Sequence, residues 1–181
     1  MSMDALILAT EACLRTQFGW SERECTAALV PNPPMFAGQM HVTVSPAGVH
    51  QQDENPQSLD ELYDLVVAIT VRMAEIPRDR KGRAKQLQDN NGPMRLANRV
   101  GAFLHGSYEV LNAANALIPD FNEETNGFIE PLKLRAITYQ EVDSAWVGAE
   151  ADDDDPGDKN LYLVMVTVGG ARRVRVLGTV G

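Results

Sequence analysis

The chain has 181 residues, of which 44% are hydrophobic and 23% are charged. These are ordinary values for a folded protein and argue against wholesale disorder. The formal charge is −9, from 25 acidic and 16 basic residues, so the chain lacks the basic footprint of a general DNA-binding protein or of one held at an anionic membrane. The length predicts a single domain over residues 1–181.

The two cysteines and the N-terminus point to a reducing compartment. Cys13 and Cys25 are too few for a disulfide scaffold, and we expect them to be unpaired. Asp4 interrupts the apolar start and no basic segment precedes it, which is atypical of a secretory signal. No apolar run approaches the roughly 18 residues that a membrane span needs. We therefore expect assembly in the cytoplasm and no membrane partner.

The first elements are predicted from apolar spacing. An amphipathic helix is expected over Met3–Phe18, ended by Gly19. Ser21 and Glu24 have the capping-box spacing, which predicts a second short helix over Glu22–Leu29. Prolines follow that helix and should stop it.

Two strands and an exposed loop come next. Alternating apolar residues predict a short strand over Gln39–Ser45. Residues 46–58 are polar and contain two prolines, which indicates a long loop. Tyr63–Met73 alternates strictly over eleven residues and is rich in β-branched types, so it predicts a long strand with one buried face.

The second half of the chain begins with a basic stretch. Residues 77–92 have few apolar side chains and are expected to form a loop, with room for a helical turn. Apolar residues then recur at steps of three and four, which predicts one long amphipathic helix over Pro93–Leu117. Gly106, inside it, indicates a close contact or a slight kink.

Closing strands are expected at the end. Leu132–Val142 alternates, residues 148–160 form an acidic loop, and Leu161–Val168 is apolar and β-branched. The Gly169-Gly170 pair predicts a tight hairpin turn that leads into a last strand over Ala171–Val180. Because helices and strands do not alternate regularly, the fold class is α+β: an antiparallel or mixed sheet with helices packed on one face.

No catalytic or metal-binding constellation emerges, so we expect neither an enzyme nor a cofactor. The three histidines are scattered, and neither cysteines nor paired carboxylates lie beside them at zinc-ligand spacing. The acidic run Asp152–Asp155 partly resembles a calcium loop. However, the fifth position would be Pro156 and the twelfth Leu163, neither of which supplies a ligand. A solvated acidic loop is the better interpretation.

Charge is nevertheless segregated along the chain. Residues 78–99 hold seven basic and two acidic side chains, whereas every charge from Glu150 to Asp158 is negative. A basic segment without interleaved aromatics is a poor single-strand nucleic-acid site, so a solvated or subunit-bridging cluster is favoured over transient contact with a phosphate backbone. The residues predicted to meet a neighbouring subunit or partner are Arg78, Asp79, Arg80, Lys81, Asp152, Asp153, Asp154 and Asp155.

The order of elements, together with the passage LDELYDLVVAITVRMAEIPRDRKG, resembles the tail-terminator and related neck proteins of tailed bacteriophages. The resemblance covers most of the chain from Met3 to Gly181, and the strand that runs into IPRDRKG, Val71–Gly82, carries most of it. Residues 46–58 and the acidic insertion near Asp152 are longer than a minimal member needs. The resemblance implies an N-terminal helix, a long central strand, a helix on the sheet and closing strands, with no catalytic residues.

The same resemblance implies a role in the virion neck. A homohexameric ring would sit on the head-proximal end of the tail tube, stop tube growth, and join the tube protein to the head connector. Genomic DNA would pass through its lumen without specific binding, helped by the net negative charge. Two alternatives remain: another neck connector, such as a head-closure or tube-completion protein, and a small metal-dependent hydrolase that uses the acidic loop.

Overall fold

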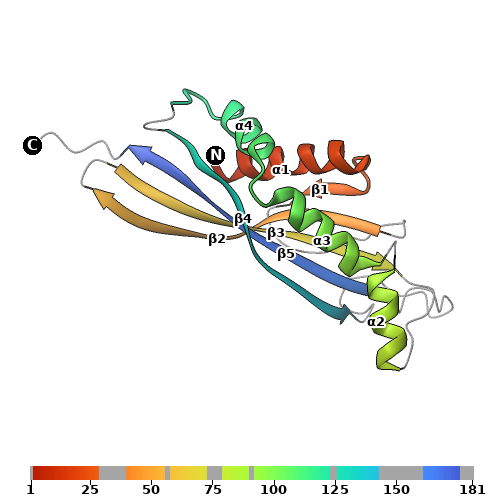
Figure 1. Cartoon of the computed structure of the whole chain (residues 1–181). Helices are drawn as coiled ribbons and strands as arrows, with labels where there is room; N and C mark the ends of the chain where they lie inside the picture. The colour runs from red at the N-terminus through yellow and green to blue at the C-terminus, as the bar shows by residue number, and fades with distance from the viewer. Residues whose placement is uncertain are drawn as a thin grey trace, which may run out of the picture.

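A computed structural model of the chain describes residues 2–28, 40–55, 58–72, 79–89, 92–122, 126–142 and 161–175. Four helices and five strands form an α+β fold with a mixed sheet (Figure 1). In chain order they are α1 (Ser2–Phe18), β1 (Cys25–Ala27), β2 (Met40–Asn55), β3 (Ser58–Arg72), α2 (Arg80–Gln88), α3 (Pro93–Leu104), α4 (Tyr108–Ala116), β4 (Asn126–Val142) and β5 (Leu161–Arg175).

The sheet has the strand order β1-β2-β3-β5-β4. Only the short β1 runs parallel to its neighbour, β2; the other three pairings are antiparallel. The predicted long strand is therefore the central one, because β3 pairs along its whole length with both β2 and β5. β4 is an edge strand among the described elements, and its pairing with β5 is interrupted by three register shifts.

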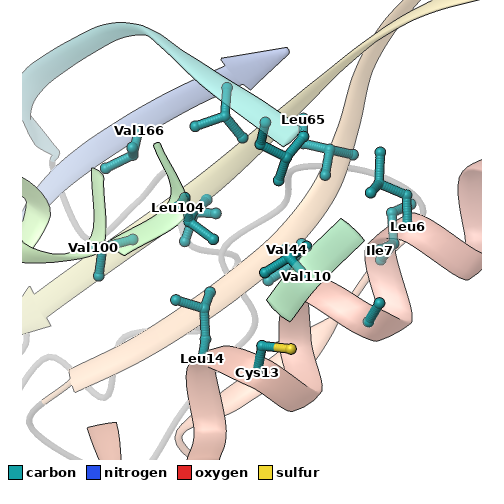
Figure 2. Packing of buried hydrophobic residues seen from close by; sticks show 14 of the residues in the cluster. Leu6, Ile7, Cys13, Leu14, Val44, Leu65, Val100, Leu104, Val110 and Val166 are labelled. Carbon is teal, nitrogen blue, oxygen red and sulfur yellow. The ribbon is translucent and has the colours of Figure 1, made fainter. Parts of the chain in front are cut away.

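Helices α1, α3 and α4 lie along one side of the sheet (Figure 1). The main core forms between these helices and the odd-numbered residues of β3, from Tyr63 to Val71. In Figure 2, Leu6 and Leu14 of α1 and Val110 of α4 gather beside Val44 of β2. The predicted burial of Leu65, Val67, Ile69 and Val71 on the helix side is confirmed.

The opposite face of the sheet has a smaller apolar cluster. Val66, Ala68 and Leu163 are buried there, and Met165 packs against them. Polar residues continue this face, where Thr43 and Ser45 of β2 and Thr70 of β3 are also buried. The second face of the sheet is thus also buried along its middle, in addition to the one buried face that the alternation in β3 predicted.

The predicted short helix after α1 is wrong. Residues 22–24 form a turn, and Cys25–Ala27 is a strand that pairs with β2. One capping-box hydrogen bond nevertheless forms, from the backbone N–H of Ser21 to Oε2 of Glu24 at 2.9 Å, and the Ser21 hydroxyl donates to the same oxygen at 2.8 Å. These bonds stabilise the turn, and strand pairing then takes the chain away from a helical path.

The predicted loop over 46–58 is also wrong in its larger part. β2 continues to Asn55 and pairs with β3 in a long hairpin, with register shifts between Pro46 and Gly48 and between Asp53 and Asn55. The shift at Pro46 fits proline's lack of a backbone N–H, which favours positions where the ladder is interrupted. Backbone pairing with β3 therefore overrides the polar composition of this segment.

The basic segment is helical rather than a loop. α2 spans Arg80–Gln88 and begins at the N-cap Asp79, whose side chain accepts a hydrogen bond of 2.7 Å from the backbone N–H of Gly82. One aspartate thus supplies the helix start that the low apolar content obscured. The predicted acidic loop over 148–160 lies outside the described residues.

The predicted helix over Pro93–Leu117 is two helices. α3 ends at Leu104, and Gly106 has a φ of 74°, which glycine adopts at little cost. Ser107 then caps α4 by accepting from the N–H of Val110 at 3.4 Å. The junction is held on β4, because the N–H of Gly106 donates to the carbonyl of Leu132 at 2.8 Å. The break lets the two helices follow different parts of the twisted sheet.

The predicted hairpin at Gly169-Gly170 is wrong. Both glycines lie inside β5, which runs unbroken from Leu161 to Arg175 and includes the start of the expected last strand. A Cβ on Gly169 would lie 2.6 Å from Oδ1 of Asp64 and 2.8 Å from Nε of Arg135. Glycine at this position therefore makes room for two charged side chains that reach over the strand.

Candidate functional site

The candidate interface begins with the basic helix α2. It carries Arg80, Lys81, Arg83 and Lys85 and no carboxylate between its ends. Arg80, Lys81 and Lys85 are exposed, and none of the ion pairs found among the described residues involves these three. Figure 1 shows α2 at the end of the molecule where β4 finishes and β5 begins. The helix therefore presents concentrated positive charge at one end of the fold.

A recess lies between α2 and the edge strand β4. It has a volume of about 450 Å³ and is lined by Arg80, Arg83, Ala84, Leu87 and Tyr139. Leu87 is buried, whereas Tyr139 is 43% exposed. The Tyr162 hydroxyl donates to Oε1 of Gln86 at 3.1 Å and so ties α2 to β5. The lining of the recess combines apolar and cationic side chains, which suits an anionic ligand that also has an apolar group.

The residues predicted to form the interface differ in their position in the structure. Arg80 and Lys81 are exposed on α2, as an interface role requires, whereas Asp79 has a structural role as the N-cap. Arg78 and Asp152–Asp155 lie outside the described residues. The structure thus gives the basic part of the predicted interface a defined helical geometry and does not place the acidic part.

A second exposed surface was not foreseen from the sequence. Tyr108, Leu117 and Phe121 are 67%, 52% and 41% exposed and lie on or just after α4. A groove of about 610 Å³ runs between this helix and the start of β4; its lining is Tyr108, Leu111, Asn112, Asn115, Ala116, Phe121, Phe128 and Ile129. Exposed apolar side chains gathered beside a groove are typical of protein–protein contact. The sequence offered no separate signal for this surface, because Tyr108 and Leu111 fit the apolar spacing of the predicted helix.

Asn115 fixes the floor of this aromatic groove. Its Nδ2 donates to the carbonyl of Phe128 at 3.1 Å, and its Oδ1 accepts from the N–H of Phe128 at 2.7 Å. One buried amide therefore satisfies both backbone groups of a β4 residue and locks α4 to the sheet. The groove is a rigid feature formed by two packed elements.

The titratable side chains have structural surroundings. His41 is buried; its Nδ1 donates to the Arg23 carbonyl at 2.9 Å, and its Nε2 accepts from the Thr26 hydroxyl at 3.0 Å. Burial lowers the pKa of His41, partly offset by the bond to Arg23. Burial raises the pKa of Cys13, with a smaller contribution from Glu109, and raises that of Cys25 to about 12. Both thiols are free. At neutral pH these groups are uncharged packing or bridging residues.

The described residues contain neither a cluster of possible metal ligands nor a helix that could span a membrane. In these ranges, no three histidine, cysteine, aspartate or glutamate side chains come close enough together to hold a metal ion. Within the same ranges, no helix has the length and apolar character needed to cross a membrane. The basic recess and the aromatic groove are two features of the described residues that can recognise another molecule.

No protein-family model matches the chain, and no curated protein matches it in sequence. Function must therefore be argued from the chain's own surfaces and from its layout.

Proposed function

We propose that this chain is a structural protein of a phage neck: a tail terminator that forms a ring on the head-proximal end of the tail tube. The observation that carries the proposal is the order and layering of the elements. An N-terminal helix, a long central strand, helices on one face of the sheet and two closing strands follow one another as the resemblance implies. The ring would be hexameric, with the tube protein and the head connector as its partners.

The exposed surfaces support an assembly role. The aromatic groove and the basic recess involve different helices and opposite ends of β4, from Phe128 to Tyr139. A ring built by one repeated contact needs two different surfaces on each subunit. Two separate recesses of different chemistry meet this requirement better than they meet the needs of a catalytic site, which would bring reactive groups together in one pocket.

The edge strand β4 supports the same proposal in another way. Long unpaired edges invite indiscriminate strand pairing, and proteins limit this with bulges, prolines and lysines. β4 has three register shifts and carries Pro131 and Lys133 near them. Such an edge favours specific contacts through side chains over open-ended sheet growth, as a closed ring requires.

The test is made on the purified protein and on the phage that encodes it. We expect rings in negative-stain images and a hexamer mass by light scattering. Deletion of the gene should give tails of uncontrolled length that do not join heads, and wild-type protein supplied in trans should restore normal virions. Deleting a different neck connector should leave tail length normal, so tail length separates the two roles. A protein that remains monomeric, with normal tails after deletion, would overturn the proposal.

A further inference from the structure

The positive charges on α2 destabilise the helix that carries them. Arg80 and Arg83 are three residues apart, and Lys81 and Lys85 are four apart, so like charges are neighbours on the helix surface. Arg80, Lys81 and Arg83 also lie close to the N-terminus, where the helix dipole disfavours positive charge. Gly82 lowers the helix propensity further. These cations therefore weaken the element that holds them, and the reason for their presence lies outside folding.

Three of the four cations of α2 are exposed to solvent. Arg80, Lys81 and Lys85 are exposed and belong to none of the ion pairs among the described residues. The nearest carboxylate in sequence, on Asp79, already accepts a hydrogen bond from Gly82. These ion pairs and the Asp79 cap thus leave the charges of Arg80, Lys81 and Lys85 available to another molecule.

The side chains that line the recess beside these cations limit the kind of ligand that can bind there. Its lining combines the apolar side chains of Ala84 and Leu87 and the ring of Tyr139 with the guanidinium groups of Arg80 and Arg83. An acidic peptide segment that also carries an apolar or aromatic side chain fits both features. Nucleic acid fits less well, because one tyrosine is not a row of stacking platforms and the chain has a net charge of −9.

We propose that α2 and its recess dock the acidic segment of a second copy of this chain, residues 146–155. By sequence this segment holds five carboxylates, Glu150 and Asp152–Asp155, no cation, and Trp146 as an aromatic side chain. The contact is heterologous, so each subunit offers α2 to one neighbour and its acidic segment to the other. This inference rests on the proposed function, because it specifies a contact within the ring.

The experiment uses paired charge reversals in the full chain. Arg80→Glu with Lys81→Glu should fold normally, because negative charge suits a helix N-terminus. The matched control, Arg23→Glu with Arg99→Glu, changes the net charge by the same amount at exposed positions outside α2 and β4. Circular dichroism establishes that each variant is folded, and sedimentation velocity at about 50 and 500 mM salt measures self-association, because screening shortens the range of such contacts.

We expect the α2 variant to associate at least tenfold more weakly than wild type at low salt, and the control variant to match wild type. Asp152→Lys with Asp153→Lys should be equally weak alone, and mixing it with the α2 variant should restore assembly. If the α2 variant forms the same rings as wild type at both salt concentrations, the inference is overturned while the ring and the proposed function stand. If wild type itself does not associate, both fail. Binding of a 30-base DNA that is lost in the α2 variant, with assembly unchanged, would assign the surface to nucleic acid and overturn the inference.

Discussion

Ile69 lies at the centre of the sheet, and its replacement tests which face of β3 meets the helices. The side chain is 0% exposed, and the residue pairs with Val42 of β2 and Val164 of β5, which belong to the same core. Ile69→Ala removes three carbon atoms. At about 0.8 kcal/mol per buried methylene this loses about 2.4 kcal/mol, and the cavity left in a packed core raises the cost to about 3–4 kcal/mol.

The matched control for this prediction is Ile137→Ala on β4. It removes the same three carbons from a side chain that is only partly buried against the core, so we expect a cost below about 2 kcal/mol. Urea unfolding should show the two losses at an unchanged m value, and Ile69→Ala should lower the melting temperature by about 6–16 °C. Ile69→Asp would bury an unpaired carboxylate and should give insoluble protein. Equal costs for the two alanine variants, or a soluble and cooperatively folding Ile69→Asp, would refute the face assignment.

Three further predictions concern single buried groups. Asn115→Ala should cost about 2–4 kcal/mol in urea unfolding, because it leaves both backbone groups of Phe128 without partners; a cost below about 1 kcal/mol would show that α4 is held by packing alone. Neither Cys13 nor Cys25 should react with a thiol reagent at pH 8 in the native state, and both should react in urea, because burial raises both pKa values; rapid native labelling of Cys25, detected by mass spectrometry, would contradict its buried position. The folded-state pKa of His41 is below its usual 6.5. As the pH falls, His41 is therefore protonated in the unfolded chain before it is protonated in the folded chain. The free energy of unfolding should keep its full contribution from neutral His41 above pH 6.5 and decrease as the pH drops below that value. The stability of His41→Gln should change less than that of wild type between pH 7 and 5, and equal slopes would mean that His41 is not responsible.

The parts of the fold that sequence reasoning predicted correctly are those in which burial alone decides the structure. The alternation in Tyr63–Met73 predicts β3 because a central strand with one helix-covered face must present apolar side chains at every second position. The first helix was predicted for a similar reason, and Gly19 ends it with a φ of 69°. In both cases the local pattern and the tertiary environment require the same residues.

The elements that were predicted wrongly from the sequence are those whose conformation is decided by pairing or packing with another strand. Residues 49–55 continue β2 by pairing with β3, although their polar composition and the preceding proline favoured a loop. Gly169-Gly170 has the composition of a turn, yet Asp64 and Arg135 reach over Gly169 and a Leu132 methyl group would lie 3.1 Å from a Cβ on Gly170. Sequence shows that a glycine is needed and does not show whether backbone freedom or lack of a side chain is the reason.

The aromatic groove was missed for a different reason. The predicted single helix assigned Tyr108 and Leu111 to one continuous apolar stripe directed at the core. The break at Gly106 and Ser107 instead begins a new helix, which leaves Tyr108 at the surface. Because the break between the two helices was not predicted, residues of an exposed surface were assigned to the core.

The basic segment shows how geometry changes a functional hypothesis whose residues were found by charge alone. As a loop, residues 77–92 would hold their cations at variable separations and would lose conformational freedom on meeting a partner. As the capped helix α2, the same cations stand at fixed spacing beside a recess, so part of the ordering cost is met during folding. Contacts that hold α2 in place include the Asp79 cap, the buried Leu87 and the bond from Tyr162 to Gln86. Replacing Arg80 and Lys81 with glutamate would favour the N-terminal turn of the helix, so the proposed contact with another molecule gives a reason for cations at these two positions that folding does not.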